Sequence, residues 1–93
     1  MASRPIDIML VEDDPSDVVR LRERLACSTL GGWNLTSTGS VAEAVALLNE
    51  SLRPDVVLVD LHLPDAVDGP DAVRRVYAAA AGVPVIAVSD AGD

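Results

Sequence analysis

The sequence predicts an α/β fold in which one parallel sheet carries helices on both faces. Two nearly continuous aliphatic runs, Ile6 to Val11 and Val56 to Asp60, are each followed or ended by acidic residues, which is typical of parallel strands buried on both sides. Helical patterns alternate with these runs, and this order favours right-handed βαβ crossovers. Hydrophobic residues make up 49% of the chain and aromatic residues only 2%, so the core is expected to consist of aliphatic side chains and alanine.

The amino-terminal half predicts a strand, a helix and a second strand. Ile6–Val11 is the first strand. A helix should begin at Pro15, because Asp14 can cap its amino end and proline suits the first helical position. Cys27, near the end of this helix, is expected to be a small packing residue. The loosely alternating, threonine-rich segment Trp33–Thr38 predicts a strand near the edge of the sheet. The apolar stripe of the helix comprises Val18, Leu21 and Leu25.

The carboxyl-terminal half repeats the alternation. Ser40–Glu43 has the form of a capping box and predicts the start of a second helix. Val56–Asp60 is the third strand, and a third helix is expected between Pro70 and Gly82. The last strand runs from about Pro84 to Val88. The expected buried positions are Val41, Ala44, Val45 and Leu48 in the second helix, and Val73, Val76, Tyr77 and Ala80 in the third.

Charge and composition exclude several classes of function. Fifteen acidic residues against seven basic ones give a formal net charge of −8, which repels nucleic acids and anionic membranes. The single cysteine cannot form an internal disulfide, and no signal peptide is apparent. The most apolar stretch, Val83 to Val88, is far shorter than the ~20 residues that span a bilayer. We therefore expect one cytoplasmic domain over residues 1–93, with no direct nucleic-acid or membrane partner.

Polar residues follow three of the predicted strands and should converge. In a parallel sheet the carboxyl ends of the strands share one edge, which places Glu12 and Asp13 near Asp60 and Ser89. Three neighbouring carboxylates repel one another, and a divalent cation removes that conflict. Oxygen ligands with few protein contacts suit Mg²⁺. An aspartate beside such a cation could attack phosphorus and form an aspartyl phosphate.

Three segments carry a family resemblance. Leu10–Pro15, Val59–Asp65 and Pro84–Ser89 resemble, in order and spacing, the three leading motifs of the response-regulator receiver domain of two-component signalling, which has a flavodoxin-like fold. The resemblance implies that Asp60 is the phosphoacceptor. It also implies a histidine kinase or phosphotransfer protein as the donor, self-phosphorylation rather than a dedicated enzyme activity, and an output domain beyond residue 93.

The same resemblance assigns the other site residues. Asp13 is similar to the direct Mg²⁺ ligand of the family, and Glu12 to the second acidic position, which often holds the metal through water. The backbone carbonyl of His62 takes the third metal contact. Ser89 matches the switch hydroxyl that turns toward the phosphoryl group.

The match implies an incomplete domain, truncated after the fourth strand. The expected strand order is 2-1-3-4, with the fifth strand and the last helices of the family absent. None of the seven basic residues is a lysine, so the family's lysine contact to the phosphoryl group is missing, and Asp90 adds negative charge beside the site. We therefore expect impaired phosphorylation, and self-association as a homodimer through an exposed edge or face.

Two other functions fit parts of the pattern. One is a pseudo-receiver, a binding or dimerisation module that keeps the acidic pocket without phosphoryl transfer. The other is a small Mg²⁺-dependent phosphatase with an aspartate nucleophile, although the second acid expected two residues after the nucleophile is here His62. Asp65 and Asp68, in the loop after Asp60, are interpreted as turn-forming residues.

Overall fold

The computed structural model describes residues 4–27, 32–50 and 52–88, which form four strands and three helices in alternation. The four strands and the three helix starts agree within about one residue with their predicted positions, whereas the first helix ends at Ala26, earlier than its predicted stop before Gly31. None of the described helices is long and apolar enough to cross a membrane. The elements are β1 (Ile6–Val11), α1 (Pro15–Ala26), β2 (Trp33–Thr38), α2 (Val41–Asn49), β3 (Val56–Asp60), α3 (Gly69–Ala80) and β4 (Val85–Val88).

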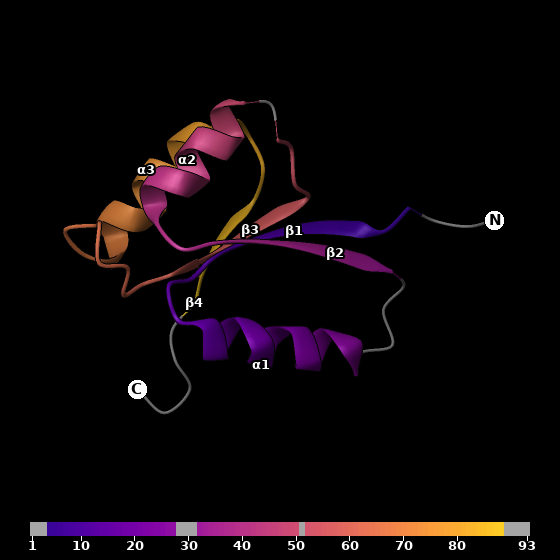
Figure 1. Ribbon diagram of the computed structural model, residues 1–93. Helices are drawn as coiled ribbons and strands as arrows, with labels where there is room; N and C mark the ends of the chain where they lie inside the picture. The colour runs from indigo at the N-terminus through magenta and orange to yellow at the C-terminus, as the bar shows by residue number, and fades with distance from the viewer. Residues whose placement is uncertain (1–3, 28–31, 51, 89–93) are drawn as a thin grey trace.

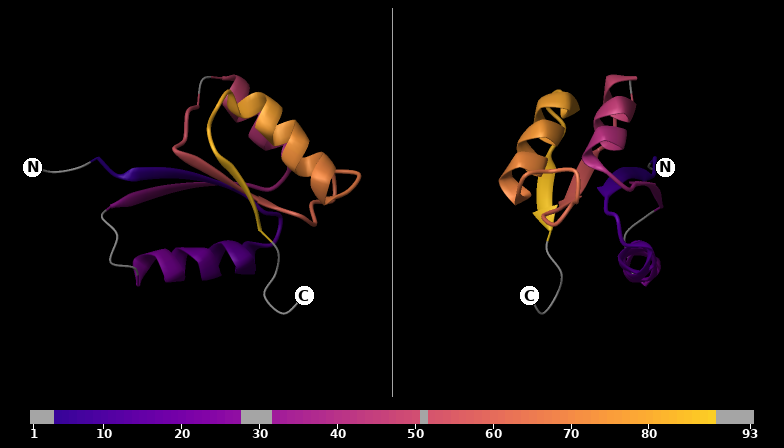
Figure 2. Two further views of the ribbon diagram at one scale, coloured as in Figure 1. Left: turned by 180° about the vertical axis from the view of Figure 1, so that it is seen from behind. Right: turned by 60° about the vertical axis from the view of Figure 1, so that its left-hand side comes forward.

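The four strands form one parallel sheet in the order β2-β1-β3-β4 (Figure 1), which confirms the predicted order. Strand β1 lies in the interior of the sheet, where Val11 pairs with Thr38 of β2 and with Val59 of β3. Helices α2 and α3 cover one face of the sheet and α1 lies on the other (Figure 2). The chain therefore has the three-layered arrangement that the sequence predicts.

The main hydrophobic core lies between the sheet and the pair α2 and α3. Alternate residues of the two central strands point into it, because side chains of a strand alternate between its faces. Valine, leucine, methionine and alanine fill this core, as the composition predicts. Its fully buried members include Met9, Val11, Val57 and Val59 from the sheet and Val41, Ala44, Leu48, Ala72, Val76 and Ala80 from the helices.

The layer formed by α1 is more loosely packed. The predicted stripe of Val18, Leu21 and Leu25 is only half-buried, and no described residue of α1 is fully buried. Cys27 is exposed, so the expectation that it packs inside was wrong. The cause is the position of α1, whose main sheet contact among the described elements is the edge strand β2.

The helix starts follow the sequence signals closely. Asp14 caps α1 by accepting a hydrogen bond from the Ser16 amide at 2.9 Å. Ser40 Oγ accepts from the Glu43 amide at 3.1 Å, as a capping box requires. The Glu43 carboxylate, however, accepts from the amide of Gly39 at 2.9 Å, one residue before the cap.

Helix α3 differs from its prediction in two respects. Tyr77 was expected on the buried face but is 63% exposed. The helix ends at Ala80, its cap residue Ala81 adopts the left-handed conformation (φ 53°), and Gly82 follows with φ 92°. Alanine pays a steric cost at such a position that glycine would not, so the glycine signal located the end of the helix one residue too late.

Two matched substitutions test the uneven packing. Val76 is fully buried between α3 and the sheet, so Val76→Ala should lower the free energy of unfolding by about 2 kcal/mol. Val18→Ala, in half-buried α1, should lower it by less than about 1 kcal/mol. Urea denaturation followed by circular dichroism measures both values. Equal losses would show that the α1 layer is as well packed as the other.

Candidate functional site

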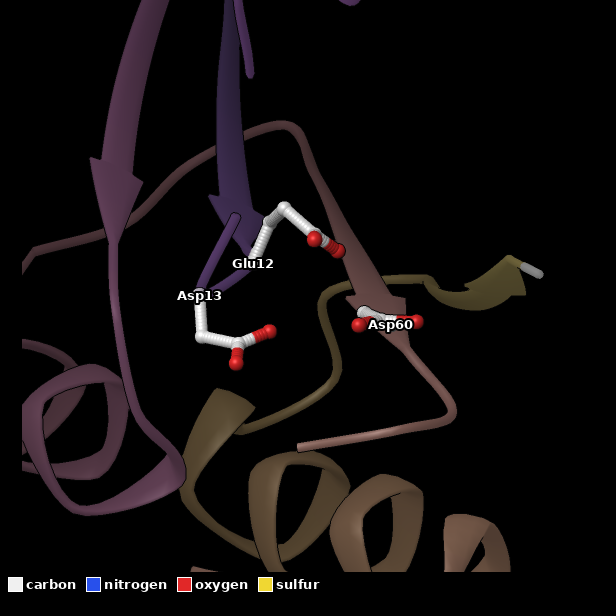
Figure 3. A group of neighbouring side chains, drawn as sticks. All are labelled: Glu12, Asp13 and Asp60. Atoms are coloured by element: carbon white, nitrogen blue, oxygen red, sulfur yellow. The ribbon is translucent and has the colours of Figure 1, made fainter. Parts of the chain in front are cut away.

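The pairing of β1 with β3 builds the candidate site. Val11 lies opposite Val59, so the residues that follow β1 lie beside the end of β3. Glu12, Asp13 and Asp60 consequently each place a carboxylate oxygen within 4.8 Å of the other two. Figure 3 shows the three side chains at the carboxyl ends of β1 and β3. The sheet thus brings together three of the residues that the sequence predicts for this site.

The three carboxylates differ in exposure and in hydrogen bonding. Glu12 is 8% exposed and Asp60 4% exposed, whereas Asp13 is open to solvent. A Glu12 oxygen accepts from the Asp14 amide at 3.1 Å, and Asp60 Oδ1 accepts from the His62 amide at 3.2 Å. Two buried acids are therefore oriented by main-chain amides at the base of a cluster whose third member faces water.

Crowding changes the acidity of Glu12. Burial, together with a hydrogen bond and charge repulsion from Asp60, raises the pKa of Glu12 to about 8, against the opposing hydrogen bond from the Asp14 amide. The physical cause is that a second negative charge beside Asp60 is costly in a partly desolvated site. Near neutral pH, without a cation, Glu12 therefore holds a proton.

The donor set fits a hard divalent cation. All three side chains offer oxygen, two of them are buried at the edge of the sheet, and Asp13 keeps the cluster open to water. Mg²⁺ prefers one or two carboxylates and retains several water molecules. A cation would also relieve the repulsion that keeps Glu12 protonated. The residues present therefore match the Mg²⁺ that the sequence predicts.

Two predicted site residues need separate comment. His62 follows Asp60 in the loop to α3 and is exposed, and its amide contacts Asp60. The role of its carbonyl in metal binding stays a prediction. Ser89, the predicted switch hydroxyl, lies outside the described residues, as does Asp90.

The loop after Asp60 contains contacts that the sequence did not predict. Asp68 is the cap of α3 and accepts from the Asp71 amide at 2.8 Å, and its place before Gly69 and Pro70 could have indicated this. Asp65 is more than a turn residue, because its two oxygens accept from the amides of Val41 and Ala42 at 3.0 Å each. No local signal could reveal this contact, since its two sides come from different segments.

Comparison with known proteins identifies the family. Residues 8–93 match the model of the response regulator receiver domain. The chain is 32% identical over 85 residues to the probable transcriptional regulatory protein TcrX of Mycobacterium tuberculosis, covering 89% of this chain and 33% of that protein. It is 33% identical over 94 residues to a two-component response regulator of Oryza sativa subsp. japonica, covering 99% of this chain and 72% of that protein. The chain belongs to the receiver domain family of two-component response regulators.

The fold agrees with this assignment. The phosphorylated cyanobacterial phytochrome response regulator RcpA superposes with a TM-score of 0.77 at 28% identity, over 97% of this chain and 69% of RcpA. The flavodoxin-like fold predicted from the motifs is thereby confirmed. The chain spans about a third of the length of TcrX.

The raised pKa of Glu12 predicts how stability depends on pH in the absence of divalent cations. Between pH 4.5 and about 8 the folded protein retains the Glu12 proton while the unfolded chain has lost it. Glu12 should therefore lower the free energy of unfolding as pH rises through this window, by up to about 1.4 kcal/mol per pH unit. Urea melts from pH 5 to pH 8 in EDTA measure the slope.

Glu12→Gln is the matched control, since the amide keeps the shape of the side chain but does not titrate. Its stability should fall less steeply than that of the wild type over the same window. Identical slopes for the two proteins would show that Glu12 ionises normally in the folded state.

Proposed function

We propose that this receiver domain accepts a phosphoryl group on Asp60 and that Mg²⁺ assists the transfer. The observation that carries the proposal is the position of the buried Asp60 carboxylate within 4.8 Å of the carboxylate oxygens of Glu12 and Asp13. The family assignment supports the same role, because the phosphorylated RcpA shares this fold.

The proposed reaction is a direct phosphoryl transfer from a phosphohistidine. An Asp60 carboxylate oxygen forms a bond to phosphorus while the N–P bond of the donor breaks. The electron pair of that bond stays on the donor imidazole, which takes up a proton. The chain modifies itself and releases no product of its own, so we class it as a self-phosphorylating module rather than a dedicated enzyme.

Glu12, Asp13, Asp60 and the His62 carbonyl are the proposed Mg²⁺ ligands. When bound, the cation would supply positive charge that offsets the charges of the Asp60 carboxylate and the phosphoryl group. The chain itself orients Asp60 through the His62 amide at 3.2 Å. Glu12 must release its proton before it can bind a cation, so Mg²⁺ affinity should increase with pH.

The proposed partners follow from the family. The phosphodonor is a histidine kinase or a phosphotransfer protein in the cytoplasm, and the readout is an output domain, because TcrX is described as a transcriptional regulatory protein three times as long as the matched region. Ser89 is proposed as the switch hydroxyl. The net charge of −8 argues against direct nucleic-acid binding by this domain.

Phosphorylation of Asp60 can be tested with a small phosphodonor. Incubation with acetyl phosphate and Mg²⁺ should add the mass of one phosphoryl group to the wild type, and Asp60→Asn should abolish the addition because the amide is not a nucleophile. Asp7→Asn, a half-buried aspartate at the opposite end of β1, is the matched control and should be phosphorylated normally. Intact-protein mass spectrometry measures all three. An unmodified wild type would contradict the proposal and favour the pseudo-receiver.

The same proposal includes self-association with a second copy. Strand β4 pairs only with β3 in the described part of the chain. Ile86 of β4 is 50% exposed, and it pairs in register with Leu58 of β3, which in turn pairs with Leu10 of β1. An apolar strand with an open edge is a template for pairing. Contact between two such edges would cover Ile86 and satisfy main-chain groups of β4.

Sedimentation equilibrium tests this association. We expect the wild type to form a dimer and Ile86→Asp to shift it to the monomer by placing a charge in the interface. Val67→Asp makes the same chemical change at a loop residue that is 90% exposed and should leave the dimer intact. A wild type that stays monomeric at high concentration would exclude the dimer.

A further inference from the structure

The loop between β3 and α3 is attached to a helix that is distant in the sequence. Asp65, in this loop, directs both carboxylate oxygens at the first two amides of α2, those of Val41 and Ala42, at 3.0 Å each. Arg75 of α3 donates to the backbone oxygen of Asp65 at 3.0 Å. Asp65 is therefore held between the amino end of α2 and the side of α3.

The Asp65 carboxylate is suited to this attachment. Burial raises the pKa of Asp65, but the hydrogen bonds from the amides of Val41, Ala42 and Asp65 itself, together with the charge of Arg75, lower it below its usual value. The group thus stays ionised at neutral pH. A negative charge at a helix amino terminus is also stabilised by the helix dipole.

Little freedom remains between Asp65 and the phosphoacceptor. Leu63 is 5% exposed and packs into the core, and the ring of Pro64 fixes its backbone φ angle. His62 then donates its amide to Asp60 Oδ1 at 3.2 Å. A displacement at Asp65 therefore has few torsions in which to be absorbed before it reaches Asp60.

We propose that Asp65 is a positioning residue that fixes the Asp60–His62 segment by tying its loop to the amino end of α2. This inference rests on the proposed function, in which Asp60 and the His62 carbonyl bind Mg²⁺. Asp65 itself touches neither the cation nor the phosphoryl group. Its effect reaches the site through the orientation of the Asp60 oxygen and of the peptide that follows it.

Ser40 provides a control that separates this role from helix capping. Ser40 Oγ also accepts from an amide in the first turn of α2, that of Glu43 at 3.1 Å, but Ser40 is not part of the loop. Ser40→Ala and Asp65→Ala both remove acceptors from the same helix end. They differ in that only Asp65→Ala releases the loop.

The experiment uses the wild type, Asp65→Ala, Asp65→Asn and Ser40→Ala. Asp65→Ala should raise the Mg²⁺ dissociation constant about tenfold, as loss of outer-shell support commonly does, and should speed hydrogen exchange of the His62 amide. Asp65→Asn keeps one acceptor oxygen and should fall between the wild type and Asp65→Ala. Ser40→Ala should lower the urea midpoint without changing Mg²⁺ affinity or His62 exchange. Calorimetric titration with MgCl₂ and amide exchange measured by nuclear magnetic resonance provide the two readouts.

Each result bears on a separate claim. Equal Mg²⁺ affinity in Asp65→Ala and Ser40→Ala would overturn the positioning role. A wild type that does not bind Mg²⁺ would instead overturn the proposed metal site. In that case His62 exchange still decides the structural part of the inference, because exchange that is unchanged in Asp65→Ala would show that Asp65 does not hold the segment.

Discussion

The parallel pairing of β1 with β3 is the contact on which both the core and the site depend. The same register that sets Val11 opposite Val59 points alternate residues of the two strands into the layer beneath α2 and α3. One residue beyond this register the aliphatic pattern stops, and the acids begin. Glu12 and Asp60 are consequently buried at the edge of the core. The position of the acidic residues therefore follows from the geometry of the parallel sheet.

The elements that the sequence predicts well are those whose signals are local. Asp14 and Ser40 each indicate the start of a helix within a few residues, and the aliphatic runs indicate both central strands. The failures concern contacts between distant segments. Tyr77 has the spacing of a core residue but lies where the sheet does not reach it. The carboxylate of Asp65 reaches α2, a neighbour that only the folded chain supplies. The convergence of Glu12, Asp13 and Asp60 was predictable because the topology of parallel sheets constrains it.

The burial of the acidic cluster lowers the stability of the folded chain. Two buried carboxylates close together destabilise the folded chain. This repulsion is reduced because Glu12 retains a proton, and main-chain amides donate hydrogen bonds to Glu12 and Asp60. Such a departure from the usual pairing of buried charges is typical of residues kept for chemistry rather than for folding. The surrounding loop is held by the hydrogen bonds of Asp65 and Asp68 and by the buried Leu63.

Helix α1 gives the molecule an uneven resistance to local unfolding. Because none of its described residues is fully buried, α1 can detach from the sheet at a smaller free-energy cost than α2 or α3, which share the core. Its first turn is capped by Asp14, the residue next to Asp13. Transient opening of this helix would therefore begin or end within one residue of the acidic cluster, and any ligand that orders Asp13 would also slow the opening of α1.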